Sequence, residues 1–235
     1  MNILVTGAEG FIGKNLCLKI NENNKFNLLK FTRDNSKKEL RNLIKISDFI
    51  IHLAAVNRTA KLADFKKSNE KLTEFICDTL IQSKKKIPII FTSSSHVKNF
   101  KKQKHVDYVK SKLNCENILK KLSINNSNPV LIYRLKGIFG KWCKPNYNSV
   151  VATFCNDIIK KKKLNIIQDK KVKFLYIDTL INNFLKLLKN SKNTKIFHEI
   201  KNYTEVSVKQ LAKKIETFHE KLSKSEIPNI KNNFD

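Results

Sequence analysis

At 235 residues, 41% of them hydrophobic, the chain is long enough for one α/β domain with a small additional lobe. No apolar run approaches the roughly 20 residues of a membrane span, and no apolar secretion signal opens the chain, so we expect a cytoplasmic protein without a membrane partner. The formal charge of +27 comes from lysines spread over every predicted helix, without the aromatic platforms of single-strand binders, so we expect no nucleic-acid partner but an attraction for anionic substrates such as nucleotide diphosphates.

The chain begins with a predicted strand over residues 2–6 and a predicted helix over about 11–23. Between them lie Gly7, Gly10 and Gly13, three of only five glycines in the chain. Glycine is needed where backbone turns tightly or approaches a ligand, and free N–H groups at a helix start bind diphosphates. An ordinary turn would need one glycine, so the pattern predicts dinucleotide binding. The residues of this motif that we expect at the dinucleotide are Thr6, Gly7, Gly10, Phe11, Ile12 and Gly13.

The second predicted strand, residues 26–31, leads to the position where such proteins select their dinucleotide. Arg33 stands there, and an arginine fork binds a 2′-phosphate in two-pronged fashion, which favours NADPH. Asp34 follows it and keeps NADH or NAD as the alternative, because an acidic residue would bind the free ribose hydroxyl.

Strands and helices then alternate, and this alternation predicts an α/β fold of the Rossmann type, a doubly wound parallel sheet with helices on both faces. The next predicted elements are a helix over 36–45, a buried strand over 48–55, a helix over about 60–84, a strand over 87–92, a helix over 107–122 and a strand over 130–134. After a loop at 137–148 we expect helices near 149–160, 178–189 and 207–222, short strands near 164–167, 174–177 and 195–198, and an irregular tail from 223. We assign residues 1–136 to the dinucleotide-binding domain, with 171–190 packing back onto it, and residues 137–235 to a small substrate-binding lobe and tail.

The third strand ends in His52, which is either a packed core histidine or turned toward the dinucleotide. Leu53, Ala54 and Ala55 follow it and let the chain approach the dinucleotide closely. Asn69 lies among apolar neighbours of the long helix, as a satisfied buried amide or as part of a proton relay. We include Leu53, Ala54, Ala55 and Asn69 among the candidate dinucleotide contacts, and His52 is left open.

A candidate catalytic set follows the serine run Ser93-Ser94-Ser95 at the end of the fourth strand. Tyr108 and Lys112 are spaced i and i+4, which places them on one face of a helix. An ammonium beside a phenol favours the phenolate and lowers the pKa of the tyrosine toward working pH. Lysine is so common in this chain that the spacing alone is weak evidence for a catalytic pair. Tyr108, however, is the one tyrosine of five that has a lysine four residues later.

The cysteines and histidines show no metal-ligand spacing. The five cysteines are odd in number and scattered, so we expect reduced, packed thiols, and the five histidines are equally dispersed. We therefore predict no metal site.

Together, the glycine loop, the serine strand and the Tyr108/Lys112 pair resemble the extended short-chain dehydrogenase/reductase superfamily. A longer stretch, Arg134 to Ser149, is more specific: its Phe139-Gly140, Trp142 and Pro145-to-Ser149 segments resemble the reductase half of CapF-type capsular-polysaccharide enzymes. Further matches lie at 49–58 and 174–178, and the resemblance covers nearly the whole chain.

This resemblance implies an NADPH-dependent oxidoreductase that reduces the 4-keto group of a UDP-2-acetamido-2,6-dideoxy-hexulose, on the route to UDP-N-acetyl-L-fucosamine for capsule or O-antigen polysaccharide. It implies that Ser94 orients the carbonyl and that Tyr108 protonates the developing alkoxide. It also implies that Lys112 lowers the pKa of Tyr108 and holds the nicotinamide ribose. The candidate substrate contacts are Arg58, Arg134, Trp142, Asn146, Asn148 and Ser149.

The chain departs from this family at two points. Lys136-Gly137 replaces a usual Pro-Asn, which puts local substrate contacts in doubt. The sequence also stops about where the family continues into a cupin epimerase domain, so we expect that domain on a separate chain or lost by truncation. A separate cupin epimerase and a homodimer are thus the protein partners we consider.

Other activities stay open. An NAD-dependent nucleotide-sugar 4-epimerase needs the same serine, tyrosine and lysine, and Asp34 would favour it. A non-catalytic dinucleotide-binding scaffold or regulatory protein is the alternative of another class. A 4,6-dehydratase ranks lower, because Ser95-His96 stands where it would need an acidic pair.

Overall fold

The computed structural model describes residues 1–59, 61, 63–102, 106–147, 149–189, 196–228 and 230. It forms two compact units. The first comprises Met1–Leu135 and Ile181–Ile200, and the second comprises Lys136–Leu180 and Lys201–Asp235. We expected residues 171–190 to return to the first unit, but residues 171–180 belong to the second because their strand pairs there.

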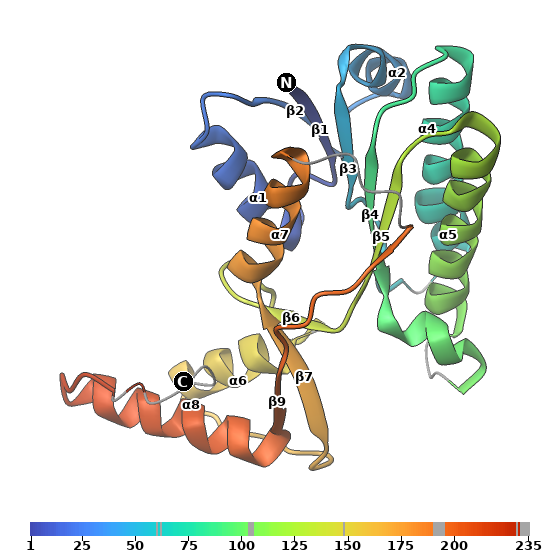
Figure 1. Ribbon diagram of the computed structural model, residues 1–235. Coiled ribbons are helices and arrows are strands. Elements are labelled where there is room, and N and C mark those ends of the chain that lie inside the picture. The colour runs from blue at the N-terminus through green and yellow to red at the C-terminus, as the bar shows by residue number, and fades with distance from the viewer. Residues whose placement is uncertain are drawn as a thin grey trace. The chain divides into compact units, whose positions relative to one another are not determined.

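The first unit is built on a six-stranded sheet with the order β2-β1-β3-β4-β5-β8 (Figure 1). Every neighbouring pair in it is parallel, as the alternating pattern predicts. Its strands are β1 (Asn2–Thr6), β2 (Asn27–Phe31), β3 (Phe49–His52), β4 (Ile89–Ser94), β5 (Val130–Leu135) and β8 (Phe197–His198). The predicted Rossmann-type fold is confirmed.

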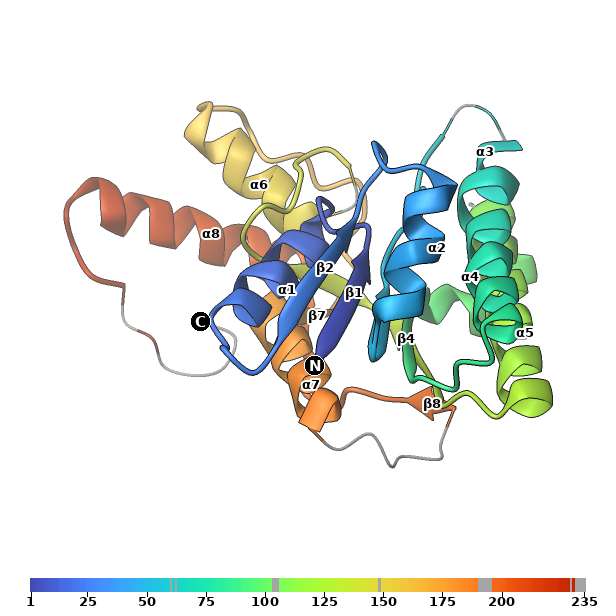
Figure 2. The ribbon, with the colours of Figure 1, turned by 90° about the horizontal axis from the view of Figure 1, so that it is seen from above.

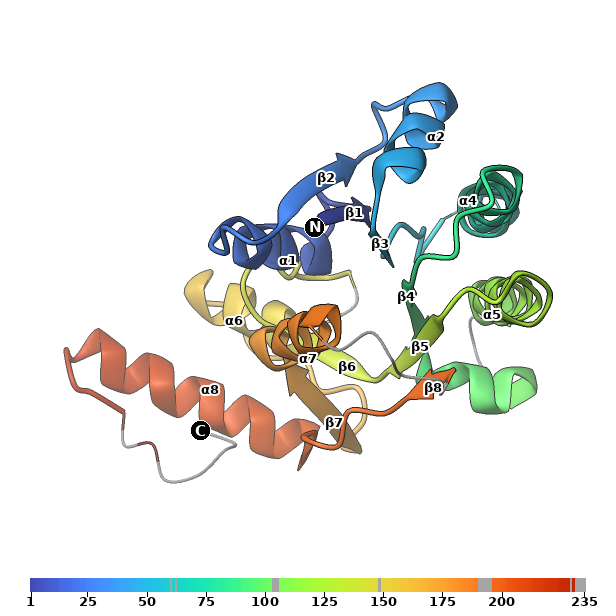
Figure 3. The same cartoon turned by 45° about the horizontal axis from the view of Figure 1, so that its top comes forward.

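Helices cover both faces of this sheet, which Figures 2 and 3 show from two further directions. One face packs against α2 (Lys37–Ile46), α4 (Lys71–Gln82) and α5 (Val106–Asn126). The other carries α1 (Phe11–Asn21) and the part of α7 (Ile177–Lys189) that belongs to this unit, where the rings of Tyr133 and Phe184 meet edge to face at 5.2 Å. The strands are therefore buried on both sides, which explains their continuous apolar sequences.

The helix expected over about 60–84 is interrupted. It comprises α3 (Ala63–Phe65), a π-helical turn (Lys66–Glu70) and α4. A separate 3₁₀ segment (Ser95–Lys102) lies between β4 and α5. Ser36 starts α2 with a reciprocal cap: its side chain accepts from the Glu39 N–H, and the Glu39 carboxylate accepts from the Ser36 N–H. The turn at Lys66–Glu70 contains Asn69, one of the predicted dinucleotide contacts.

The second unit holds a three-stranded sheet with the order β6-β7-β9. Its elements are β6 (Gly137–Phe139), α6 (Val150–Ile159), β7 (Lys171–Tyr176), β9 (Thr204–Ser207) and α8 (Val208–Ser223). The core of this unit includes Phe154, Phe174, Val206 and Leu211. The strand expected near 164–167 is absent, and β6 and β9 were not predicted, because three or four residues are too few to show an alternating pattern.

No helix in the ranges that the structure describes has an apolar stretch long enough to cross a lipid bilayer.

Candidate active site

The glycine loop after β1 is shaped by close backbone contacts. Gly7 has a φ of +70°, and a Cβ there would lie 2.8 Å from the Cα and N of Ala54. A Cβ on Gly13 would overlap the carbonyl oxygen of Gly7. Both positions therefore require glycine, Gly7 for its conformation as well as its space. The loop also joins β2, since the Gly7 N–H donates to the Phe31 carbonyl at 3.0 Å.

The start of α1 fits an anionic ligand. Gly10 is its N-cap and offers no side chain, and its first turn contains no acidic residue. The first N–H groups of a helix have no partner within the helix, and they carry the positive end of its dipole. Phe11 and Ile12 begin the helix half-buried, beside this end. The arrangement suits the diphosphate of a dinucleotide.

A layer of polar side chains lies between the ends of the strands and helices α4 and α5. The hydroxyl of Thr6 accepts from the Ala54 N–H at 3.2 Å and lies 2.7 Å from Nδ1 of His52. Nε2 of His52 lies 3.0 Å from the Thr73 hydroxyl, which donates to the Asn69 carbonyl at 2.8 Å. The layer thus connects the residue before the glycine loop to the π-helical turn.

These hydrogen bonds favour one tautomer of His52. The single proton of the Thr73 hydroxyl can go to the Asn69 carbonyl at 2.8 Å or to the Cys115 sulfur at 3.3 Å, and in either case the hydroxyl accepts from Nε2–H of His52. Nδ1 is then the acceptor for the Thr6 hydroxyl. Burial lowers the pKa of His52 to about 3, with a smaller contribution from the Lys112 ammonium, and the ring is neutral. His52 is a buried histidine whose two nitrogens are both paired within the protein.

Asn69 clamps two segments together. Its amide oxygen accepts from the Val56 N–H at 2.8 Å, and its amide nitrogen contacts the Val56 carbonyl at 3.2 Å and the Ser111 hydroxyl at 3.0 Å. Asn69 is 2% exposed, so the structure shows a satisfied buried amide. It fixes the segment after β3 to α5 one residue before Lys112. Its contact with a dinucleotide stays a prediction.

Lys112 is 3% exposed on the inner side of α5. Its ammonium donates to the Thr92 carbonyl at 2.9 Å and lies 4.7 Å from the centre of the Phe91 ring. Burial lowers the pKa of Lys112 to about 8, although Cys115 and Glu116 act in the opposite direction. A lysine with a lowered pKa is thus held against the end of β4.

Ser94 and Tyr108 belong to the same two elements. Ser94 ends β4, is 8% exposed, and accepts from the His96 N–H at 3.3 Å. Tyr108 lies one turn before Lys112 in α5, half-buried, with its ring 6.1 Å from the ring of Phe65. The bond from Lys112 to Thr92 holds α5 against β4 two residues before Ser94.

The remaining predicted dinucleotide contacts lie around the glycine loop. Arg33 and Asp34 are both exposed in the turn after β2, and their placement alone does not select between NADPH and NADH. Leu53, Ala54 and Ala55 are half-buried directly after β3. Arg58 is exposed in the same segment.

Arg134 is engaged elsewhere than we predicted. Its guanidinium donates to both oxygens of the fully buried Glu116, at 2.9 and 2.6 Å, and lies 4.5 Å from the centre of the Phe197 ring. This pair ties β5 to α5. A two-pronged ion pair with a buried carboxylate is costly to break, so the structure gives Arg134 a structural partner, and its contact with a substrate stays a prediction.

The loop of the second unit contains the other predicted substrate residues. Trp142 is 40% exposed, with the Lys141 ammonium 4.5 Å from its ring, and Asn146 is exposed, with its N–H donating to Thr153. Ser149 is buried and caps α6 by accepting from the Ala152 N–H at 3.3 Å, so its hydroxyl already has a structural role. Asn148 lies outside the described residues.

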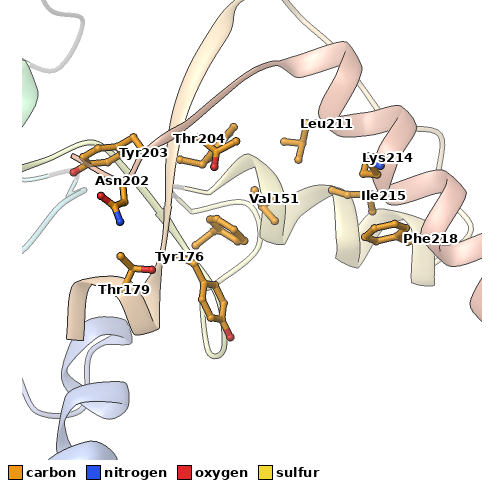
Figure 4. Close-up of a pocket in the computed structure, with 12 residues that line it drawn as sticks. Val151, Tyr176, Thr179, Asn202, Tyr203, Thr204, Leu211, Lys214, Ile215 and Phe218 are labelled. Atoms are coloured by element: carbon orange, nitrogen blue, oxygen red, sulfur yellow. The ribbon is translucent and has the colours of Figure 1, made fainter. Parts of the chain in front are cut away.

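Sequence reasoning missed a cavity of about 630 Å³ inside the second unit. Figure 4 shows Lys214, Ile215 and Phe218 along α8, and Asn202, Tyr203 and Thr204 on the segment that enters β9. The full lining is Phe139, Val151, Phe174, Tyr176, Thr179, Asn202, Tyr203, Thr204, Leu211, Lys214, Ile215 and Phe218. Aromatic rings and a few polar groups are typical of a ligand pocket. No motif could have revealed it, because the lining comes from separate segments.

Comparison with known proteins decides the family. The model of the NAD dependent epimerase/dehydratase family matches residues 3–200. The chain belongs to this family. It is 37% identical over 221 residues to a UDP-2-acetamido-2,6-beta-L-arabino-hexul-4-ose reductase of Pseudomonas aeruginosa, covering 93% of this chain and 58% of that protein. The chain thus spans little more than half of that relative's length.

Solved structures of the same fold agree. The capsular polysaccharide assembling protein CapF of Staphylococcus aureus matches with a TM-score of 0.86 and 29% identity, over 100% of this chain and 63% of CapF. A UDP-glucuronic acid 4-epimerase of Bacillus cereus, in complex with NAD, matches with a TM-score of 0.81 and 20% identity, over 94% of this chain and 84% of that one. The family and the geometry of the glycine loop together give this chain a nicotinamide dinucleotide as cofactor, and the predicted resemblance is confirmed.

Proposed function

We propose that this chain reduces the 4-keto group of a UDP-2-acetamido-2,6-dideoxy-hexulose with NADPH, in the synthesis of a nucleotide sugar of the UDP-N-acetyl-L-fucosamine type for capsule or O-antigen polysaccharide. The observation that carries the proposal is the buried Lys112, bonded to the end of β4 at Thr92 with Tyr108 one turn before it. The similarity to a protein named as such a reductase supports the substrate.

Each residue of the set has a defined task. The bound dinucleotide supplies the hydride. Ser94 donates a hydrogen bond to the keto oxygen and orients it, and Tyr108 delivers its phenolic proton to that oxygen as the alkoxide develops. The Lys112 ammonium stabilises the phenolate that remains. Because the pKa of Lys112 is about 8, a modest change in its surroundings is enough for the side chain to gain or lose a proton.

For the dinucleotide we favour NADPH over NADH. Arg33 is exposed two residues after Phe31, whose carbonyl binds the glycine loop, and an arginine fork suits an adenosine 2′-phosphate. Replacing Arg33 with Ala should weaken the binding of NADPH more than that of NADH, by about 10-fold for the loss of a charged hydrogen bond. Equal weakening of both would contradict this choice.

A second function rests on Asp34, which is exposed beside Arg33 and could bind a ribose hydroxyl. In that case the chain would be a 4-epimerase that retains NAD: the sugar is oxidised at C4, and the keto intermediate is then re-reduced so that NAD is regenerated. Such an enzyme would be purified with NAD bound and would consume none of it. A reductase releases its oxidised dinucleotide after each turnover.

We also propose that the cavity of the second unit receives the nucleotide end of the substrate. Aromatic rings such as those of Tyr176 and Phe218 suit a base, and Lys214 suits a phosphate. A cupin epimerase and a second copy of this chain remain our proposed protein partners, and co-purification and sedimentation would test them.

The test is a spectroscopic assay that follows oxidation of NADPH and, separately, NADH. The substrate is a freshly made UDP-4-keto-6-deoxy sugar, with and without an added epimerase. We expect oxidation of NADPH that depends on the sugar. If folded protein oxidises neither cofactor under both conditions, the proposed reduction is wrong.

A further inference from the structure

Ser93 lies directly before the candidate catalytic serine, Ser94. Within the described residues, its hydroxyl is the buried side-chain oxygen or nitrogen that has no hydrogen-bond partner. Ser93 is 5% exposed, and an unpaired buried hydroxyl is unfavourable because it has lost its hydrogen bonds to water. Such a group in a native protein calls for an explanation, and a ligand is one.

Strand geometry places this hydroxyl in the polar layer. Side chains alternate along a strand, so Ser93 shares a face with Phe91, which packs in the core beneath α4 and α5. It is opposite Arg134 in the register of β4 and β5. Arg134 is satisfied by Glu116. His52, which pairs with Phe91 in the register of β3 and β4, is satisfied by Thr6 and Thr73.

Lys112 is the neighbour with hydrogen-bonding capacity to spare. Its ammonium has three donors. One donates to the Thr92 carbonyl, which belongs to the peptide bond that joins Thr92 to Ser93. The ammonium thus lies at the peptide bond that leads into Ser93. It has spare donors, and the Ser93 hydroxyl has no partner among the described residues.

We propose that Ser93 is a binding residue for the dinucleotide, and that its hydroxyl and the Lys112 ammonium together bind a hydroxyl of the nicotinamide-side ribose. The inference rests on the proposed role of Lys112 at that ribose. A sugar hydroxyl fits both groups, because it accepts from the ammonium and exchanges a hydrogen bond with the serine. A vicinal diol offers two such oxygens.

Two other serines of the chain show what a purely structural role looks like. Ser111 donates to the Tyr108 carbonyl at 2.8 Å, and Ser149 accepts from the Ala152 N–H at 3.3 Å. Each has a partner within the protein, whereas Ser93 has none in the described part of the chain. Alanine would fill the same buried position without the cost of an unpaired hydroxyl. The serine therefore has a use that the unliganded protein does not show.

The experiment compares Ser93→Ala with Ser95→Ala, a half-buried neighbour from the same serine run. Calorimetric titration gives Kd for two ligand pairs: NADPH with adenosine 2′,5′-bisphosphate, and NAD with adenosine diphosphate. Adenosine diphosphate lacks the nicotinamide riboside, and adenosine 2′,5′-bisphosphate lacks that riboside together with its phosphate. Thermal unfolding of the free proteins gives Tm.

We expect Ser93→Ala to bind the full dinucleotide about 2- to 10-fold more weakly, as befits one hydrogen bond, and to bind the smaller ligand as the parent does. Its Tm without ligand should be unchanged or higher, because the unpaired hydroxyl is gone. Ser95→Ala should bind both ligands as the parent does.

Three outcomes would overturn the inference. An unchanged Kd for the full dinucleotide would show that Ser93 makes no such contact. Equal weakening of both members of a pair, or a lower Tm with unchanged Kd, would show a structural role alone. Failure of the parent protein to bind either full dinucleotide would instead contradict the proposed function, and the role of Ser93 in dinucleotide binding would fail with it.

Discussion

The two units of this protein present their functional groups in different ways. In the first, the candidate chemistry lies in a buried layer of polar side chains beneath α4 and α5, where His52, Asn69 and Lys112 all have partners within the protein. In the second, the candidate residues line an aromatic cavity or lie exposed on the loop at Trp142 and Asn146. The first unit is preorganised for one reaction, and the second offers surface that can fit a particular ligand. The contrast suggests that the chemistry is fixed by the first unit and the choice of sugar nucleotide by the second.

The largest effect should come from Lys112→Met, which removes the ammonium beside Tyr108. We expect the reduction rate to fall by about 10²- to 10⁴-fold, the usual worth of an assisted proton transfer. Single-turnover oxidation of NADPH measures it. Lys110→Met, an exposed lysine on the same helix, is the matched control and should stay close to the parent. Equal rates for the two variants would remove Lys112 from the mechanism.

Gly13→Ala should cost about 1–3 kcal/mol of the free energy of unfolding, because its Cβ would overlap the carbonyl of Gly7. Gly10→Ala is the control, since a Cβ there would lie 3.2 Å from the same oxygen and meet little else. Urea unfolding of the ligand-free proteins measures both. If Gly10→Ala were the more harmful change, the close packing of α1 against the loop would not explain the glycines.

The pH dependence of stability should reveal the buried ammonium. Burial lowers the pKa of Lys112 to about 8 in the folded protein, and an unfolded lysine titrates near 10.4. The unfolded chain therefore binds more protons between these values, and stability rises with pH there. Relative to Lys112→Met, the parent should gain up to about 3 kcal/mol from pH 7 to pH 10. A pH-independent difference between the two proteins would place the Lys112 pKa outside this window.

Thr73 tests whether the polar layer positions the site. Thr73→Val removes the hydroxyl that accepts from His52 and donates to Asn69, at nearly constant volume. We expect a loss of about 1–3 kcal/mol in stability and weaker dinucleotide binding, because His52 then has an unpaired N–H. Thr73→Ser keeps the hydroxyl and should restore dinucleotide affinity. If Val and Ser behaved alike in binding, the layer would contribute to folding alone.

The smallest effect concerns the second unit. Lys214→Ala should raise the KM for the nucleotide sugar by about 3- to 10-fold through loss of one phosphate contact, with little change in kcat. Lys213→Ala, its exposed neighbour on α8, should change neither. A fall in kcat with constant KM, or no difference between the two lysines, would contradict a nucleotide site in this cavity.

Much of the first unit could be predicted because its signals are local. The glycine spacing, the apolar strands and the i, i+4 pair Tyr108/Lys112 each lie within one short stretch of sequence. Arg134 shows where such reasoning ends: its partner Glu116 is 18 residues earlier in sequence, and nothing local indicates that this arginine is already paired. The same holds for His52, whose partners come from β1 and α4.

The second unit was less predictable for a physical reason. Its sheet includes strands of three and four residues, too short for a pattern of period two, and its cavity draws on separate elements. Tyr203 and Lys214 carry no motif that would single them out among the many lysines and scattered tyrosines. Ser149 looked like a substrate contact because of its neighbours, but its hydroxyl is a helix cap.

We propose that this chain catalyses hydride transfer to C4 of a nucleotide sugar with net consumption of the dinucleotide. Incubation with a UDP-4-keto-6-deoxy sugar and NADPH deuterated at the transferred position tests it directly, with mass spectrometry of the sugar product. We predict one deuterium per product molecule and an equal amount of NADP⁺, with both greatly reduced in Tyr108→Phe. A converted sugar that carries no deuterium and leaves the dinucleotide unconsumed would show an epimerase, and would contradict the account.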